Sequence, residues 1–423
     1  MEFINVDLKN FKRFESLHLE FKPGINILLG GNGVGKTSIL EALSIALSDF
    51  FNGISDVPKK GIESNQIRFD THALGDASTG KEYFSASITS KIHLDKEVGI
   101  GEVVRRDNTA SSRTRYLGRG ISLYATRICN NMDSVLPLIC YYSTKRLAPP
   151  KKENYGIKSK NKLNDRVCGY IGCLDDTLDL KAMKTWCLDM ELEAFHADKP
   201  IKEYELFKSI VATFMAKMTE TELPPKIYYS RKHEELVYQE NSKAVPINYM
   251  SAGYQSLLWM IMDMAFRLAQ TNPAVENFRD IPGIVMIDEV DMHLHPTWQW
   301  RIISALHEVF PKIQFILATH SPIIISSAKD AHLIALHGED EVQYLPHAYA
   351  YSVDDILESR QLSKSVPDEL RILASAFDRE LNVGNLNNAK TILNSMIEQF
   401  GANNPTVVEA QSTYDLEAIA VDS

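Results

Sequence analysis

The sequence predicts an α/β fold organised around a phosphate-binding loop, and three observations support this prediction. The apolar run 25–29 leads into a glycine-rich stretch that ends in Gly35-Lys36-Thr37. The residues after Thr37 carry apolar side chains at helical spacing. A second apolar run, residues 284–287, ends in two carboxylates, Asp288 and Glu289. A buried strand, a glycine-rich loop and a helix in this order are typical of a sheet that binds nucleoside triphosphates.

The composition is that of an ordinary globular protein long enough to form two or three lobes. Apolar residues make up 44% of the 423 residues and charged residues 24%. No run of about 18 uncharged apolar residues occurs, and an alternating strand pattern begins at residue 2. We therefore expect no membrane contact and no signal peptide. The five scattered cysteines fit a reducing cytoplasm, and Cys168 and Cys173 lack the further ligands of a zinc site.

The net charge of −10 argues against a protein that coats nucleic acid without sequence preference. Two local runs are nevertheless basic, residues 105–119 and 145–166. Each run is either a solvated loop or part of a nucleic-acid-binding groove. The sequence leaves these two readings open, so nucleic acid stays a possible partner.

The glycine-rich loop follows the pattern G-x-x-x-x-G-K-[ST]. Three glycines, at 30, 33 and 35, allow the backbone to curl so that its N–H groups face a polyphosphate. Lys36 supplies a positive charge for the β- and γ-phosphate oxygens, and the Thr37 hydroxyl is a ligand for Mg²⁺. The alternative is a glycine-rich turn with a chance Lys-Thr. We expect ATP to contact the whole loop: Gly30, Gly31, Asn32, Gly33, Val34, Gly35, Lys36, Thr37 and Ser38.

The chain before the loop alternates as strands, over residues 2–8 and 17–21. Between them lies a polar and aromatic corner that contains Lys12 and Arg13. These two side chains either reach the nucleotide or cap a hairpin. After the loop helix, residues 52–81 have the composition of irregular structure, residues 82–104 alternate like antiparallel strands, and residues 136–142 form a further buried strand.

The pattern becomes helical after Pro149-Pro150. Apolar residues recur every three or four positions over 180–190 and 207–218, followed by a return hairpin over 227–238. Further on, Ser251-Ala252-Gly253 precedes a strongly apolar helix, which is either an anion site or an ordinary N-cap.

Two more strands carry polar side chains at their ends. After residues 284–287, Asp288 is placed to hold Mg²⁺ through water, and Glu289 is placed to orient or deprotonate an attacking water. After the strand 315–318, His320 projects at the carboxyl end, where ligands of α/β sheets bind. Residues 336–423 have helical patterns, including stripes at 370–381 and 386–400.

This set resembles the ABC-type ATPase heads of the RecF, SMC and OLD families. In those families a Walker A loop, a signature serine loop, a Walker B strand with a catalytic glutamate, a D-loop and a switch histidine occur in this order. By position, the resemblance assigns Walker A to residues 30–37, the signature to 250–253, Walker B to 284–288 and the D-loop to 291–296. It makes Glu289, His320 and Lys36 catalytic, and it places Ser251 and Gly253 on nucleotide bound by a second copy.

Two departures from that pattern stand out. Ala252 occupies a signature position that is usually glycine, and no glutamine follows the strand 136–142, where Ser143-Thr144-Lys145-Arg146 stands instead. The spacing also excludes two other classes. Hexameric AAA+ rings place Walker B much closer to Walker A, and GTPases need an Asn-Lys-x-Asp, which residues 161–164 do not supply.

The resemblance predicts the fold class in more detail: a P-loop NTPase of ABC-ATPase head type with an antiparallel β subdomain, a helical insert and a helical C-terminal extension. We expect four regions: ATPase lobe I at 1–150, a mainly helical insert with a return hairpin at 151–245, ATPase lobe II at 246–335, and the helical extension at 336–423. Within the group, the chain is most similar to compact antiphage ATPases of the Septu type, retron-associated forms included.

This resemblance implies an ATPase, with ATP and Mg²⁺, that dimerises around ATP and regulates a separate nuclease of HNH type. We expect slow turnover, no nuclease activity of its own, and a cytoplasmic location. Two alternatives stay open: a RecF-like DNA-binding ATPase of repair or replication, and an ATP-binding scaffold with little turnover.

Overall fold

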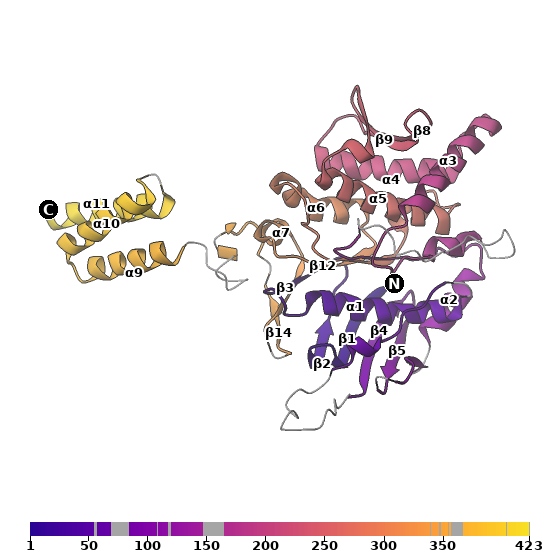
Figure 1. Ribbon diagram of the computed structural model, residues 1–423, viewed down its shortest axis with the longest axis horizontal. Coiled ribbons are helices and arrows are strands. Elements are labelled where there is room, and N and C mark those ends of the chain that lie inside the picture. The colour runs from indigo at the N-terminus through magenta and orange to yellow at the C-terminus, as the bar shows by residue number, and fades with distance from the viewer. Residues whose placement is uncertain are drawn as a thin grey trace. The chain divides into compact units, whose positions relative to one another are not determined.

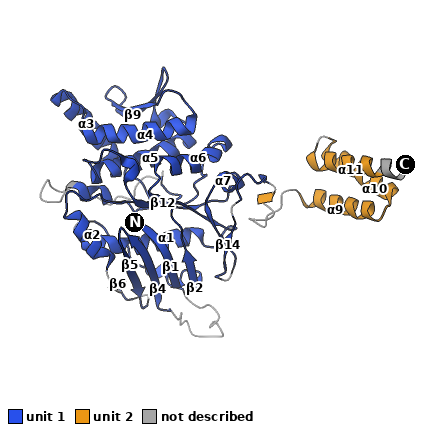
Figure 2. Cartoon of the chain, turned by 180° about the vertical axis from the view of Figure 1, so that it is seen from behind, with its two compact units in different colours: residues 1–353 blue, residues 354–423 orange. Residues whose placement is uncertain are grey.

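The structure is a computed structural model that describes residues 1–54, 57–68, 84–107, 109–116, 120–146, 165–338, 340–346, 348–353, 355–356, 367–402 and 404–422. The chain divides into two compact units, residues 1–353 and 354–423 (Figure 2). The expected break at Pro149-Pro150 and most of the basic run 145–166 lie outside the described residues.

A six-stranded sheet forms the centre of the first unit. Its strands, in spatial order, are β14 (Val342–Leu345), β13 (His332–Leu336), β3 (Ile25–Leu29), β12 (Ile313–Ala318), β11 (Gly283–Ile287) and β7 (Leu138–Tyr142). All neighbours pair in parallel except β14, which is antiparallel to β13. Every residue of β3, β7, β11 and β12 is buried, as expected for a parallel sheet covered on both faces. The carboxyl ends of these four strands therefore meet at one edge.

A second sheet is antiparallel and has the order β2 (Phe14–Glu20), β1 (Glu2–Phe11), β4 (Ala86–Leu94), β5 (Glu97–Arg105) and β6 (Arg113–Tyr116). Helix α1 (Lys36–Leu47) packs against β1, β4 and β5 and also contacts β12 (Figure 1). The antiparallel strands predicted over 82–104 are confirmed. The first strand is longer than predicted, because β1 continues to Phe11, which pairs with Phe14. Strand β6 and helix α2 (Ile121–Cys129) were not predicted.

Helix α5 (Ala252–Thr271) packs on the other side of the central sheet, with α6 (Pro296–Val309) and the short α7 (Pro322–Ser327). Helices α3 (Leu180–Ala197) and α4 (Lys202–Thr219) form an outer layer, in which α3 contacts α5, and α4 contacts both α5 and α6. A three-stranded sheet of β8 (Lys226–Ser230), β9 (Glu235–Glu240) and β10 (Lys243–Pro246) lies beside α3 and α4 (Figure 1). The helices predicted over 180–190 and 207–218 and the return hairpin are confirmed, while β10 was not predicted.

Short 3₁₀ helices connect these elements: η1 (Ser48–Gly53), η2 (Ser64–Gln66), η3 (Asp165–Tyr170), η4 (Ile247–Tyr249) and η5 (Phe278–Asp280). A buried polar chain ties β7 to α5. The Tyr142 hydroxyl donates to Asp263 at 2.9 Å, and Asp263 pairs with Arg267 at 2.7 Å. Because all three groups are buried, this pairing fixes α5 against the sheet.

The second unit is a three-helix bundle of α9 (Asp368–Asn382), α10 (Leu386–Phe400) and α11 (Pro405–Asp422). Leu370, Phe377, Leu393 and Met396 lie in its core, so both predicted stripes are confirmed as packing faces. The expectation that residues 336–423 are helical throughout was wrong at the start. Residues 342–345 form β14, whose backbone groups pair with β13 at the sheet edge.

Among the described residues, no helix is long and apolar enough to cross a bilayer. None of the five cysteines, all of which lie in the described ranges, forms a disulfide. Burial raises the pKa of the Cys129 thiol to about 11 and that of Cys140 to about 12, so both side chains are neutral packing groups at pH 7.

Candidate active site

The glycine-rich loop joins β3 to α1 at the carboxyl edge of the central sheet. Gly30, Gly33 and Gly35 all have positive φ angles, as the sequence predicted. Gly35 is the most constrained, because a Cβ on it would collide with the ring of Phe14. The loop is therefore clamped between the sheet and the β1–β2 corner. Its backbone N–H groups precede the first turn of α1, which is an arrangement suited to phosphate.

Lys36 is the first residue of α1 and is 6% exposed. Its ammonium donates to the carbonyls of Gly30 at 2.8 Å and Gly31 at 3.1 Å. Burial lowers the pKa of Lys36 to about 8, against the opposing influence of Asp288, Glu289 and Asp291. A buried cation beside a polyphosphate cradle is stabilised when an anion binds next to it.

The end of β11 supplies the acidic groups. The Thr37 hydroxyl donates to Asp288 Oδ2 at 2.8 Å, so the two side chains that the sequence predicts to hold Mg²⁺ lie side by side. Burial raises the pKa of the Asp288 carboxyl, while the Thr37 hydrogen bond acts in the opposite direction. Glu289 follows with φ of 45°, a left-handed conformation that is uncommon for glutamate. Such backbone conformations persist where surrounding contacts hold them, as at catalytic sites.

His320 lies next to Lys36 because β12 is inserted between β3 and β11. Its Nε2 atom is 2.8 Å from Lys36 Nζ. Burial and the neighbouring ammonium lower the pKa of His320, so the imidazole is neutral at pH 7 and accepts this hydrogen bond. The preceding residue, Thr319, donates to the carboxylate of Asp291. This hydrogen bond joins Asp291, in the predicted D-loop, to the residue before the predicted switch histidine within one chain.

Arg146 completes this edge of the sheet, and no role was predicted for it from the sequence. Its guanidinium is 3% exposed and donates to the carbonyls of Asp288 at 2.9 Å and Glu289 at 3.2 Å. Its Nε atom donates to Ser256 Oγ on α5 at 3.3 Å. The position of Arg146 in the sequence could have indicated a role at the site, because Arg146 follows β7 at the same sheet edge as Asp288. It is the last residue of the Ser143-Thr144-Lys145-Arg146 stretch that follows β7.

Ser251 and Gly253 are not brought to the phosphate loop of their own chain. Ser251 is the exposed N-cap of α5, and its side chain makes no capping hydrogen bond. It lines a pocket whose described lining residues all lie between 238 and 254. Gly253 has a packing role, because a Cβ there would collide with the carbonyl oxygen of His293. That close approach sets the amino end of α5 against the D-loop.

Lys12 and Arg13 form the turn between β1 and β2. Lys12 has φ of 50° and pairs with Glu41 on α1, while Arg13 donates to the carbonyl of Gly33 in the phosphate loop. Arg13 therefore lies at the loop. For both residues, nucleotide contact and hairpin capping are the two predicted roles, and both stay predictions.

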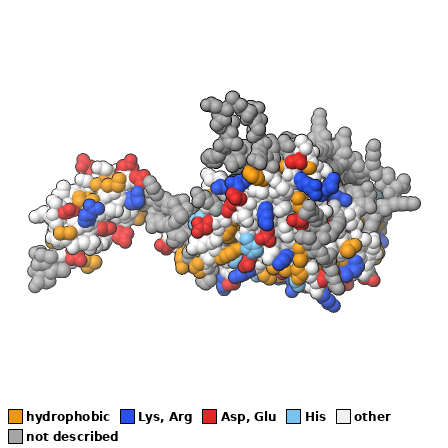
Figure 3. Space-filling view, turned by 90° about the horizontal axis from the view of Figure 1, so that it is seen from below, with side chains coloured by type: hydrophobic (Ala, Val, Ile, Leu, Met, Phe, Trp, Pro, Cys, Tyr) orange, Lys and Arg blue, Asp and Glu red, His pale blue; other side chains and the backbone are white. Residues whose placement is uncertain are grey.

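The two basic runs are partly internal. Arg146 and Arg166 are buried and hydrogen-bonded to backbone carbonyls, and Arg105 donates to the carbonyl of Ile62. On the face shown in Figure 3, basic and acidic side chains are interspersed.

Within the described ranges, no group of three or more His, Cys, Asp or Glu is arranged to hold a metal by itself. The oxygens of Thr37 and Asp288 fit a hard cation that takes its other ligands from phosphate and water.

Known proteins match this chain in sequence and in fold. A family described as "AAA domain" matches residues 5–211, and one described as "AAA ATPase domain" matches residues 188–325. The "Retron Ec83 probable ATPase" of Escherichia coli is 27% identical over 75% of this chain and 68% of its own length. The "Septu protein PtuA" of Bacillus mycoides is 24% identical over 88% of this chain and 46% of its own length. The chain is thus similar to the retron and Septu proteins over most of its length.

A crystal structure of an SMC head bound to the C-winged helix domain of ScpA superposes with a TM-score of 0.50. The alignment covers 82% of this chain and 98% of the SMC head at 14% identity, so it bears on the fold alone. The predicted fold class is confirmed: an α/β ATPase head with an antiparallel β subdomain and a helical C-terminal region.

Proposed function

We propose that this protein binds ATP on residues 30–38 and hydrolyses it at the carboxyl edge of the central sheet. The observation that carries the proposal is the convergence of three strand ends, those of β3, β11 and β12. They bring together Lys36, the Thr37–Asp288 pair, Glu289 and His320. These groups are separated by up to 284 residues in the chain. The matches to an ATPase domain and to a probable ATPase support the same activity.

Each side chain has a distinct role in this proposal. Lys36 and the loop N–H groups bind the phosphates, and Thr37 and Asp288 hold Mg²⁺. When bound, Mg²⁺ neutralises charge that develops on the phosphate oxygens. Glu289 orients the attacking water and accepts its proton. Neutral His320 stands beside Lys36, where it contacts the terminal phosphate.

The catalytic unit in this proposal is a pair of chains, each supplying half of two pockets. Ser251 is exposed and lies in a pocket without any residue of the phosphate loop. The positive end of a 20-residue helix is therefore available to the nucleotide of a second copy. ATP bound between the copies stabilises the pair, and hydrolysis releases it.

The kinship with retron and Septu proteins supports a role in antiphage defence, in which nucleotide state controls a separate nuclease of HNH type. Co-purification of the tagged protein from its native host, followed by mass spectrometry, identifies the partner. We expect a nuclease to be retained by wild type and its retention to depend on ATP. Phage plating with the Lys36→Ala and Glu289→Gln variants tests the role in the cell. Unchanged protection by both variants would remove ATP turnover from the defence function.

A further inference from the structure

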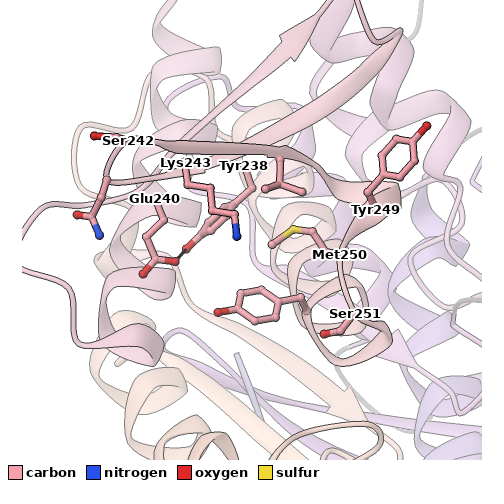
Figure 4. Close-up of a pocket in the computed structure, with 10 residues that line it drawn as sticks. Tyr238, Glu240, Ser242, Lys243, Tyr249, Met250 and Ser251 are labelled. Carbon is pink, nitrogen blue, oxygen red and sulfur yellow. Dashed lines mark hydrogen bonds between the residues drawn. The ribbon is translucent and has the colours of Figure 1, made fainter.

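A pocket of about 790 Å³ opens beside the amino end of α5. Residues of β9, β10, η4 and the first turn of α5 line it: Tyr238, Glu240, Asn241, Ser242, Lys243, Val245, Tyr249, Met250, Ser251 and Tyr254. Figure 4 shows Glu240 and Lys243 projecting from the strands and Ser251 at the opposite end, with Met250 between them. The volume lies in the range of pockets that enclose small ligands.

The sequence builds this pocket from a tight hairpin. Glu240 pairs with Lys243 across the two-residue turn Asn241-Ser242, and Asn241 adopts a φ of 52°. The rings of Tyr238 and Tyr254 lie 6.4 Å apart, and Tyr254 packs edge-on against Trp298 at 4.3 Å. The pocket therefore has a rigid aromatic wall, with a carboxylate and an ammonium among its lining groups.

We propose that this pocket holds the purine and ribose of the ATP carried on the phosphate loop of a second copy. This inference rests on the proposed function, in which two copies enclose ATP. Ser251 lines the same pocket, and in this proposal the terminal phosphates face Ser251 while the base occupies the pocket. Tyr249 is 83% exposed and free to stack on a base. The Glu240 carboxylate accepts hydrogen bonds from ribose hydroxyls or an exocyclic amine, and Lys243 donates to base nitrogens.

Among the described residues of the β1–β2 corner, the rings of Phe11 and Phe14 are packed into the β-subdomain core, at 0% and 2% exposed. They cannot stack on a base without unfolding the β1–β2 corner.

The first test measures ATP-dependent self-association in a Glu289→Gln background by sedimentation velocity. Tyr249→Ala is compared with Tyr249→Trp and with Tyr349→Ala, a control that removes a 48%-exposed tyrosine outside the pocket. We expect Tyr249→Ala to weaken association driven by ATP about 100-fold, because a pair of chains loses two stacking contacts of about tenfold each. Tyr249→Trp and Tyr349→Ala should associate like wild type. Association driven by tripolyphosphate, which has no base, should be the same in all variants.

If wild type and Tyr249→Ala self-associate equally well with ATP, the pocket assignment is wrong and the two-copy function is unaffected. Equal weakening with ATP and with tripolyphosphate also overturns it, because Tyr249 would then act on the protein interface. If wild type fails to associate with any nucleotide, both this inference and the two-copy function are wrong.

The second test mixes Lys36→Ala with Tyr249→Ala at a concentration where neither hydrolyses ATP alone. In a mixed pair, one site combines the intact loop of one variant with the intact pocket of the other. We expect recovery of up to about a quarter of wild-type turnover, because half of random pairs are mixed and each has one intact site. If the pocket instead serves nucleotide bound by its own chain, mixing restores nothing and the inference fails.

Discussion

Replacing Arg146 tests whether the acidic end of β11 is held in place by one buried side chain. The guanidinium makes four hydrogen bonds, to the carbonyls of Ser143, Asp288 and Glu289 and to Ser256 Oγ. Arg146→Ala leaves three carbonyl groups without this donor, at about 1 to 2 kcal/mol each, or roughly 3 to 6 kcal/mol in total. Arg146→Lys keeps the positive charge but loses the planar guanidinium with its several N–H donors. We therefore expect about half of that loss in the free energy of unfolding.

Turnover should fall more sharply than stability. The Glu289 backbone is left-handed, and its carbonyl accepts from Arg146. Without that contact the carboxylate loses its fixed position relative to the attacking water. We expect kcat to fall about 100-fold in Arg146→Ala, because misplacement by about 1 Å has an effect of this size. ATP affinity should change little, since Lys36 and the loop are untouched.

The assay combines thermal unfolding, binding of a fluorescent ATP analogue and steady-state ATP hydrolysis. We expect Tm to fall by roughly 5 °C or more in Arg146→Ala. Lys145→Ala is the matched control, because Lys145 is the exposed neighbour. Wild-type kcat in a folded Arg146→Ala variant would refute the positioning role. An increase in KM with an unchanged kcat would place Arg146 in nucleotide binding instead.

Three further predictions address the phosphate loop, the acidic end and the signature. Glu289→Gln should bind ATP like wild type and hydrolyse it at least about 100-fold more slowly; turnover near the wild-type rate would exclude Glu289 as the base. Because the pKa of Lys36 is about 8 in the folded chain and 10.5 in the unfolded one, the unfolded state binds more protons between these values. The ATP-free protein should therefore gain stability as pH rises from about 8 to about 10.5, relative to Lys36→Met, and parallel pH profiles of chemical denaturation for the two proteins would contradict this. Gly253→Ala should displace the amino end of α5 from the His293 carbonyl and weaken ATP-dependent self-association, while the affinity of one chain for ATP is kept. Association equal to wild type in sedimentation velocity would show that this close approach does not matter.

The sequence alone determined the parts of the site that lie within a few residues of each other. The phosphate loop, the Asp288-Glu289 pair and the position of His320 each follow from a short pattern, because a buried strand that ends in polar residues constrains its own neighbourhood. The two helical stripes of the second unit were likewise readable from spacing.

Tertiary structure decided which of these pieces meet. The insertion of β12 between β3 and β11 brings His320 to Lys36, and the parallel pairing of β7 with β11 brings Arg146 to Asp288. Neither contact is encoded by local spacing, because strand order in a sheet depends on packing across the whole core. The conformation of residues 342–345 was also decided this way. Their local pattern does not specify a strand, and pairing with the edge of β13 satisfies their backbone hydrogen bonds.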